Sequence, residues 1–171
     1  YMGRPLAAAT YGVLNAWALR HIKYHVGVSD AMRRLLISRG FRRNDTFAIY
    51  NGIDFGREIP VTDRAAFYER VGARVAPGDV VVGAAARLDP VKDLATLVRA
   101  VAAARRSAPN IKLIIAGEGA ERPNLTALAG ELGMSDALTL CGWLDDMDEF
   151  YGAIDINALT SISETFPYAI T

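Results

Sequence analysis

The residues best suited to chemistry stand near the end of the chain, where a carboxylate follows an apolar run. The run is Ile154 to Leu159, followed by Thr160-Ser161 and then by Glu164-Thr165-Phe166-Pro167. This order predicts a buried strand, a loop and the first turn of a helix. A helix N-terminus presents unpaired N–H groups to phosphate or sugar oxygens, and a carboxylate beside it accepts hydrogen bonds from sugar hydroxyls. The pattern therefore predicts a binding loop.

Three earlier apolar runs are also followed by residues that suit ligand binding. Their loops are Arg87 to Asp93, Gly117-Glu118-Gly119 and Gly142-Trp143-Leu144. Because the carboxyl ends of parallel strands meet at one edge of a sheet, we expect all four loops to share a cleft. The cleft would combine two cations, a glycine-rich turn, an aromatic residue and a carboxylate. That combination fits a nucleotide diphosphate joined to a sugar.

Each component has its own physical basis. Arg87 offers a planar fork and Lys92 a mobile point charge, and both suit a diphosphate. Glycines let a main chain approach a ligand closely. The loop at Trp143 could supply main-chain partners and an apolar wall for a base or ribose. A departing diphosphate gains negative charge, so fixed cations beside it lower the barrier.

Each component, taken alone, also has an ordinary structural interpretation. Arg87 and Lys92 could be surface residues at a helix start, and Trp143 could serve packing. Gly117-Glu118-Gly119 lacks the full G-x-G-x-x-G pattern, so a dinucleotide site is not supported. Glu164 could be a first-turn acid that favours the helix dipole. Their joint occurrence at successive strand ends favours the binding site.

The elements that position these loops alternate regularly from Val80 onward. Apolar runs predict four strands: Val80–Ala86, Ile111–Ala116, Ala137–Cys141 and Ile154–Leu159. Helical spacing predicts the helices between them, marked by Leu94, Leu97, Val98 and Val101, by Pro123 to Gly133, and by Met147, Phe150 and Tyr151. Continuous apolar strands between amphipathic helices indicate an α/β fold with a parallel, Rossmann-like sheet covered on both faces.

The residue pattern in the first third of the chain predicts a helix, a strand, a second helix and a second strand. We expect strands at His25–Val28 and Thr46–Tyr50, with Ser29 as the N-cap of the intervening helix and Gly40 at its end. A short helix is expected around Ala65–Val71, within a linker.

Composition limits the function classes. Of the 171 residues, 51% are hydrophobic and 22% charged, and the net charge is zero, so a packed core is expected and wholesale disorder is not. Eight Lys or Arg stand between Tyr1 and Asn44 against one acid, and six acids with no Lys or Arg stand between Ala137 and Thr171. The basic segment could meet phosphates or an anionic membrane surface, or form an ordinary solvated face.

The sequence also disfavours a disulfide-rich protein, a membrane-spanning or signal segment, and a zinc site. Cys141 is the single cysteine, which excludes an internal disulfide framework and suits a reducing compartment. The apolar stretch Pro5 to Leu19 is too short to span a bilayer and lacks a clear cleavage site. His21 and His25 lack the further ligands of a zinc site, so no metal is expected.

These motifs resemble a known family. Residues Val80 to Thr171 look like the donor-binding domain of the group 1 (family 4) retaining glycosyltransferases of the GT-B fold. The matching stretches are Ala86–Asp93, Ile115–Gly119, Leu140–Trp143 and Ser161–Pro167. Upstream, Gly27-Val28-Ser29 and Ile49–Asp54 resemble the family's last N-domain strands and its crossing into the second domain.

The resemblance covers roughly residues 24–171 and implies a domain organisation. Residues 1–54 would be the last units of the N-terminal, acceptor-side domain, and residues 55–79 a linker region. Residues 80–171 would be an incomplete C-terminal nucleotide-sugar-binding domain, truncated at its C-terminus.

The resemblance also implies roles for single residues. Arg87 and Lys92 match the pair that holds the donor diphosphate. Glu164 matches the first of two motif glutamates, which contacts donor-sugar hydroxyls near the reacting face; the second would follow Thr171. The other implied donor contacts are the turn glycines Gly117 and Gly119, the nucleobase border Gly142, Trp143 and Leu144, and the main chain of Thr165 and Phe166. Thr165 stands where the family often has glycine.

The implied activity is transfer of a sugar from a nucleotide-diphosphate donor to a hydroxyl acceptor, with retention at the anomeric carbon. The acceptor would be a glycan or glycolipid in polysaccharide or glycolipid synthesis. No metal or other cofactor and no nucleic acid partner are expected. The expected location is cytoplasmic, with the basic segment allowing peripheral association at the inner membrane face.

Three other interpretations stay open at this point. They are a sugar-nucleotide epimerase of the same fold, a non-catalytic domain that binds a nucleotide sugar, and an unrelated doubly wound domain. The chain alone is expected to be inactive, because most of the acceptor-side domain would lie upstream of Tyr1.

Overall fold

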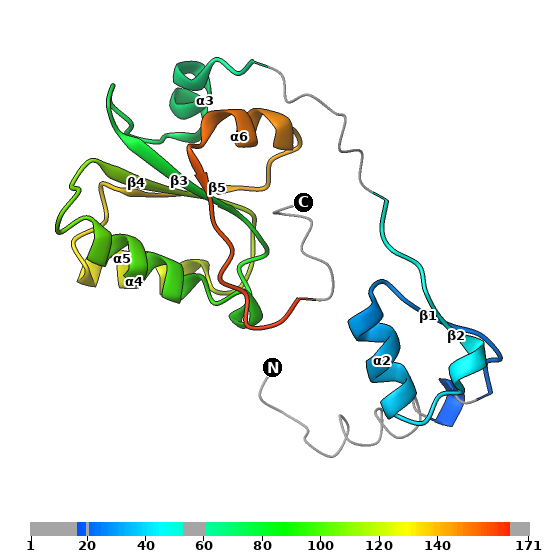
Figure 1. Ribbon diagram of the computed structural model, residues 1–171. Coiled ribbons are helices and arrows are strands. Elements are labelled where there is room, and N and C mark those ends of the chain that lie inside the picture. Colours follow the sequence, from blue (N-terminus) through cyan, green and yellow to red (C-terminus); the bar gives the residue numbers. More distant parts are fainter. Residues whose placement is uncertain (1–16, 20, 53–60, 165–171) are drawn as a thin grey trace. The chain divides into compact units, whose positions relative to one another are not determined.

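The structure is a computed structural model that describes residues 17–19, 21–52 and 61–164. The chain divides into two compact units, Tyr1–Ile53 and Asp54–Thr171 (Figure 1). Within the described ranges, no helix is both long and apolar enough to cross a membrane.

The first unit contains one parallel strand pair with a helix between its strands. Strand β1 (His25–Gly27) pairs with β2 (Thr46–Ala48), and helix α2 (Asp30–Ser38) connects them. A 3₁₀ turn, η1 (Arg43–Asp45), precedes β2. The Ser29 hydroxyl accepts a hydrogen bond from the Met32 amide at 3.2 Å, which confirms the predicted N-cap. Strand β2 ends two residues before the predicted limit, Tyr50.

The second unit is built on a parallel sheet of four strands. These are β3 (Val80–Ala85), β4 (Ile111–Ala116), β5 (Leu138–Gly142) and β6 (Ile156–Asn157), in the spatial order β5-β4-β3-β6. All three strand pairings are parallel, and β3 and β4 are in register along their whole length. The predicted parallel α/β fold is confirmed.

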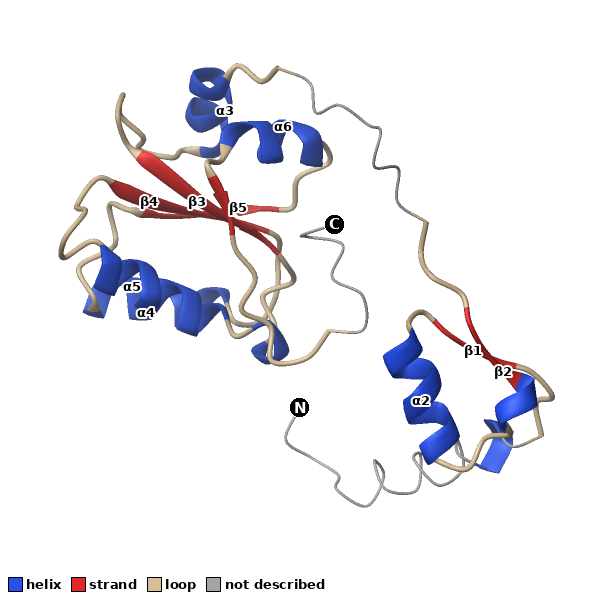
Figure 2. Ribbon diagram, viewed as in Figure 1, coloured by secondary structure: helices blue, strands red, loops and turns tan. Residues whose placement is uncertain are grey.

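Helices cover both faces of this sheet, as Figure 2 shows. Their bounds are α3 (Arg64–Val71), α4 (Leu94–Ala104), α5 (Arg122–Glu131) and α6 (Met147–Ala153), with a 3₁₀ turn η2 (Pro90–Lys92) before α4. Helices α4 and α5 lie on one face, and α3 and α6 on the other. The predicted inner face of α4 is correct, since Leu94, Leu97, Val98 and Val101 are all buried.

Helix α3 belongs to the core of the second unit. It lies in the stretch 55–79 that was expected as a linker region with a short helix. Phe67 is fully buried, and its ring stands edge-on to Phe150 of α6 at a centroid distance of 6.4 Å. The Tyr68 hydroxyl donates to the carbonyl of Ala153. These contacts fix α3 over the sheet.

Strand β6 differs from its prediction. A buried strand was expected over Ile154–Leu159, but β6 has two residues and both are exposed. It pairs with β3 through Val82↔Ile156 and Gly83↔Asn157, and no strand of the described residues pairs with its other side. An edge position explains the exposure of Ile156, which apolar character alone could not reveal.

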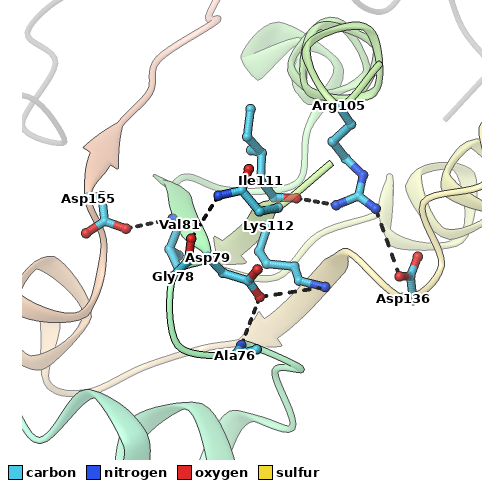
Figure 3. Close-up of polar contacts among 10 residues, drawn as sticks. Ala76, Gly78, Asp79, Val81, Arg105, Ile111, Lys112, Asp136 and Asp155 are labelled. Carbon is cyan, nitrogen blue, oxygen red and sulfur yellow. Dashed lines mark hydrogen bonds and ion pairs between the residues drawn. The ribbon is translucent and has the colours of Figure 1, made fainter. Parts of the chain in front are cut away.

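The amino end of the sheet is held by internal polar contacts (Figure 3). The Asp155 carboxylate accepts from the Val81 amide at 2.7 Å, and the Asp155 amide donates to the Val81 carbonyl at 2.8 Å. Asp79 accepts from the Ala76 amide at 2.8 Å and lies 3.9 Å from the Lys112 ammonium. These carboxylates stabilise the fold by accepting from main-chain amides and, for Asp79, by pairing with Lys112, whereas the loops rich in candidate ligands follow the opposite end of the strands.

Candidate functional site

A cleft of about 700 Å³ opens at the carboxyl ends of the strands. Its walls come from the ends of β3, β4 and β5 and from α6. The lining residues are Ala85, Ala86, Arg87, Ala116, Gly117, Glu118, Trp143, Leu144, Asp145, Met147 and Tyr151. Four predicted site residues, Arg87, Gly117, Trp143 and Leu144, are among them. Three of the four predicted loops therefore meet at one hollow.

Gly117 holds the first two loops together. Its φ is +133°, and a Cβ at this position would overlap the carbonyl oxygen of Ala86. Its amide donates to the Gly142 carbonyl at 2.7 Å. The glycine is therefore required by the chain's own close approach, whether or not a ligand is present.

Gly119 has a similar role beside Leu88. A Cβ there would overlap the Leu88 main chain. The Leu88 amide donates to the Glu118 carbonyl, and the Glu121 amide donates to the Leu88 carbonyl, both at 2.9 Å. Leu88 itself is fully buried. The loops after β3 and β4 are consequently packed and hydrogen-bonded against each other beside the cleft.

The third loop presents an aromatic ring to the cleft. Trp143 is 75% exposed, and its Nε1–H donates to the Asp145 carboxylate at 3.0 Å. Gly142, with φ +81°, precedes it, and a Cβ there would lie 2.8 Å from the Glu118 carboxylate. An exposed ring tied at its edge offers a flat surface for a ligand rather than core packing.

Arg87 stands at the cleft with most of its guanidinium in solvent. Its side chain is 74% exposed and pairs with Asp89 at 3.0 Å. An exposed pair of this kind is weak and easily exchanged for another anion. The side chain is therefore free to turn toward a ligand phosphate.

Neither Lys92 nor Glu164 lines this cleft, contrary to the expectation that all four loops share it, but the two side chains form a close ion pair with each other. The Lys92 ammonium lies 2.5 Å from the Glu164 carboxylate, and their side chains are 19% and 21% exposed. The hydrogen bond from Lys92 lowers the pKa of Glu164 below its ordinary value of 4.5. Glu164 is thus a carboxylate at neutral pH, available to accept hydrogen bonds.

Main-chain contacts bring this pair together from distant parts of the sequence. The Thr160 hydroxyl lies 3.1 Å from the Lys92 carbonyl and 3.0 Å from the Asp93 carbonyl. The Ile162 amide donates to the Val91 carbonyl at 2.9 Å. The segment after β6 is therefore held against the loop that carries Arg87 and Lys92.

Two predicted residues, Thr165 and Phe166, lie outside the described residues, as does the helix expected to start there. Residues that the sequence interpretation did not select also line the cleft: Asp145, and Met147 and Tyr151 of α6. The apolar spacing of Met147 and Tyr151 predicts a buried helix face but does not reveal that this face ends at a cleft.

The site combines cations, a carboxylate and an apolar wall. In the described part of the chain, no group of three or more His, Cys, Asp or Glu side chains is arranged to hold a metal ion. Burial raises the pKa of the Cys141 thiol to about 11, so Cys141 is a neutral thiol at physiological pH. The arrangement suits binding of an anionic, partly apolar ligand.

The family of the chain follows from its sequence. Residues 69–171, more than half of the chain, match the family described as glycosyl transferases group 1. The chain belongs to this family. The structural neighbours are GT-B glycosyltransferases, in agreement with the fold.

Individual relatives agree with the assignment. The chain is 33% identical over 147 residues to the D-inositol 3-phosphate glycosyltransferase of Nocardia farcinica, covering 81% of the chain and 32% of the relative. It is 37% identical over 89 residues to the lipopolysaccharide core biosynthesis glycosyltransferase LpsE of Rhizobium meliloti, covering 52% and 25%. The chain thus spans a quarter to a third of the length of these relatives.

A solved structure shows the same architecture with ligands. Alr3699/HepE from Anabaena, in complex with UDP and glucose, matches with a TM-score of 0.73 and 26% identity. The match covers 86% of this chain and 40% of that protein. WaaG, a glycosyltransferase involved in lipopolysaccharide biosynthesis, matches with a TM-score of 0.70 at 16% identity, which supports the fold alone.

Proposed function

We propose that the complete protein transfers a sugar from a nucleoside-diphosphate donor to a hydroxyl acceptor, with retention at the anomeric carbon. The observation that carries the proposal is the cleft at the strand ends, lined by Arg87, together with the Lys92–Glu164 pair, whose lysine belongs to the same loop as Arg87. Membership of the group 1 family supports the same reaction class.

The donor would bind with its base against the exposed ring of Trp143 and beside Leu144. Stacking on an exposed aromatic ring suits any nucleobase, because every base has a π-face. The diphosphate would lie against Arg87 and Lys92. Their charges stabilise the negative charge that develops on the departing diphosphate, which is the work that a divalent metal does in other sites. We therefore propose that the reaction uses no metal and no other cofactor.

Glu164 would accept hydrogen bonds from the hydroxyls of the donor sugar. Its lowered pKa keeps it ionised throughout the neutral range. A fixed acceptor of this kind orients the sugar ring over the acceptor hydroxyl, and orientation is a large part of the rate gain in group transfer. In a retaining reaction, the leaving diphosphate oxygen takes the proton of the incoming hydroxyl on the same face.

The acceptor and the pathway are inferred from relatives. The names of the Rhizobium meliloti and Nocardia farcinica proteins point to lipopolysaccharide core and D-inositol 3-phosphate chemistry, so we infer a glycan, glycolipid or related polyol acceptor. The Anabaena complex with UDP and glucose makes uridine nucleotides the first donors to test. We propose a cytoplasmic location, with peripheral binding at the inner membrane face through the basic N-terminal segment.

The decisive experiment incubates the complete protein with labelled uridine, guanosine and adenosine diphosphate sugars and a panel of hydroxyl acceptors. Product analysis by mass spectrometry, with the anomeric configuration from NMR, is expected to reveal one retained glycoside. A changed sugar in the nucleotide pool would indicate an epimerase instead. Donor binding without any new product across the panel would indicate a non-catalytic binding domain, and an inverted product would refute retention.

A further inference from the structure

We propose that Thr160 is a positioning residue for Lys92: its hydroxyl holds the Lys92–Asp93 turn and thereby keeps the Lys92 ammonium in place for the donor diphosphate. The inference rests on the proposed function, because it concerns the cation assigned there to the diphosphate. It adds a residue that neither the sequence interpretation nor the cleft lining selects.

The contact is between one hydroxyl and two successive carbonyls. The Thr160 Oγ1 lies 3.1 Å from the Lys92 carbonyl oxygen and 3.0 Å from that of Asp93. A hydroxyl has a single proton to donate, so the two carbonyls share it in a three-centre hydrogen bond. One side chain therefore fixes the direction of both peptide groups that follow Lys92.

This turn needs an external support because its geometry is unfavourable. Asp93 has φ 45° and ψ 44°, in the left-handed region, and no other non-glycine residue of the described ranges has a positive φ. A Cβ disfavours this conformation. The Asp93 side chain makes no capping hydrogen bond to α4, so it does not compensate locally. The turn has main-chain hydrogen bonds of its own, from the Asp93 amide to the Pro90 carbonyl and from the Thr96 amide to the Asp93 carbonyl, and the Thr160 hydroxyl adds a side-chain contact to them.

The same short segment also holds the residues around Lys92. The Ile162 amide donates to the Val91 carbonyl at 2.9 Å, and the Glu164 carboxylate pairs with the Lys92 ammonium. A donor diphosphate would compete with Glu164 for that ammonium. The Thr160 contact goes to main-chain oxygens, so it persists when the ammonium turns toward phosphate. The position of Lys92 thus depends on Thr160 in the bound state as well.

Two substitutions at this half-buried position separate the hydroxyl from the shape of the side chain. Thr160→Val keeps the branched shape and removes the donor, and Thr160→Ser keeps the donor. The test measures Kd in the complete protein by calorimetry for the diphosphates and monophosphates of uridine, guanosine and adenosine. Thr160→Val is expected to weaken the diphosphate that binds by about three- to tenfold. The matching monophosphate should change by less than about twofold, and Thr160→Ser should restore the diphosphate affinity.

Several results would overturn the inference. Equal losses for diphosphate and monophosphate would indicate a merely structural residue, and so would a valine variant with unchanged affinities or a serine variant that fails to restore them. Thr160→Ala provides a second hydroxyl-free variant if valine does not fold. Unfolding of both hydroxyl-free variants, measured by thermal melting while Thr160→Ser stays folded, would also assign the hydroxyl to folding alone.

Lys92→Ala, measured in parallel, separates this inference from the proposed function. If Lys92→Ala loses diphosphate and monophosphate affinity equally, or no diphosphate binds at all, the diphosphate role of Lys92 is wrong and the inference falls with it. If Lys92→Ala loses diphosphate affinity selectively and Thr160→Val does not, the inference about Thr160 alone is wrong.

Discussion

The Lys92 ammonium and the Glu164 carboxylate lie 2.5 Å apart, although 72 positions separate the two residues in the sequence. Their side chains are 19% and 21% exposed, but the contact between them is open to solvent, so water screens the pair in part. In the absence of a donor, Lys92, which is assigned to the diphosphate, is therefore paired with Glu164, which is assigned to the sugar. Donor binding must exchange this internal contact for contacts with the ligand.

Glu164→Gln tests that exchange. Removal of the carboxylate charge leaves Lys92 without its competitor, so a free nucleoside diphosphate should bind about two- to fivefold more tightly. Sugar transfer by the complete protein should fall at least about tenfold, because the fixed acceptor for the sugar hydroxyls is weakened. Calorimetry with UDP and initial-rate measurements check the two effects. Glu149→Gln, which alters an ion-paired glutamate on α6, is the matched control and should leave both unchanged. Weaker diphosphate binding in Glu164→Gln would contradict the competition.

The same pair predicts a pH dependence of stability. The pKa of Glu164 is lowered in the folded chain, first by the hydrogen bond from Lys92. A carboxylate with a lowered folded pKa stabilises the fold above its unfolded value of 4.5, and this stability is lost as the pH falls through the folded pKa. Glu164→Gln should therefore unfold more easily than the original chain by at most about 1 kcal/mol at pH 7.

Thermal unfolding of Glu164→Gln and of the original chain between pH 7 and pH 3 measures this contribution to stability. The difference in Tm is expected to shrink below pH 4.5 and to vanish in acid. A difference that is the same at every pH would show that Glu164 stabilises the fold without its charge.

Much of this fold follows from patterns within the sequence. The strand Ile111–Ala116 has the predicted limits, and the face of α4 carried by Leu94, Leu97, Val98 and Val101 is buried as its spacing indicates. These elements are predictable because continuous apolar strands and a 3.6-residue period are local signals. The predicted extent of β6 was wrong because the edge position of a strand is not a local signal. It depends on which other strands lie beside it.

The loops that form the site could be predicted from the sequence, but the contacts between residues of different loops could not. Three of the four predicted loops gave Arg87, Gly117, Trp143 and Leu144 at one cleft. The roles of Gly117 and Gly119 in holding two loops together depend on Ala86 and Leu88, which stand some 30 residues earlier in the sequence. Thr160 has no motif of its own, so its contacts with Lys92 and Asp93 emerge only from the fold.

Arg87 should act on the diphosphate of the donor. Arg87→Ala is expected to weaken nucleoside-diphosphate binding by about tenfold and monophosphate binding by less. Arg87→Lys should fall between Arg87→Ala and the original protein, because it keeps the charge and loses the fork. Arg99→Ala, an exposed arginine on α4, is the control and should have no effect. Equal losses for the two nucleotides, measured by calorimetry, would remove the diphosphate role.

Gly117 should be intolerant of any side chain. Gly117→Ala places a methyl group on the Ala86 carbonyl and should lower the free energy of unfolding by about 2–4 kcal/mol. Gly133→Ala is the matched control, because Gly133 also has a positive φ, +66°, but faces open space. It should cost about 1 kcal/mol from the backbone alone. Urea unfolding of the two variants gives both values, and equal losses would show that the close approach to Ala86 is not what fixes this glycine.

Trp143 should report nucleotide binding directly. Its ring is 75% exposed beside the cleft, so a base stacked on it would quench its fluorescence and change its solvent exposure. Titration of the complete protein with UDP, GDP and ADP is expected to give quenching that saturates with one of them. Trp143→Phe should abolish this signal and weaken binding by about three- to tenfold, because stacking is reduced. Trp17→Phe, which changes the other tryptophan of the chain, is the control and should keep the full signal. Quenching that survives in Trp143→Phe would place the base away from this loop and leave the diphosphate cations without a base site beside them.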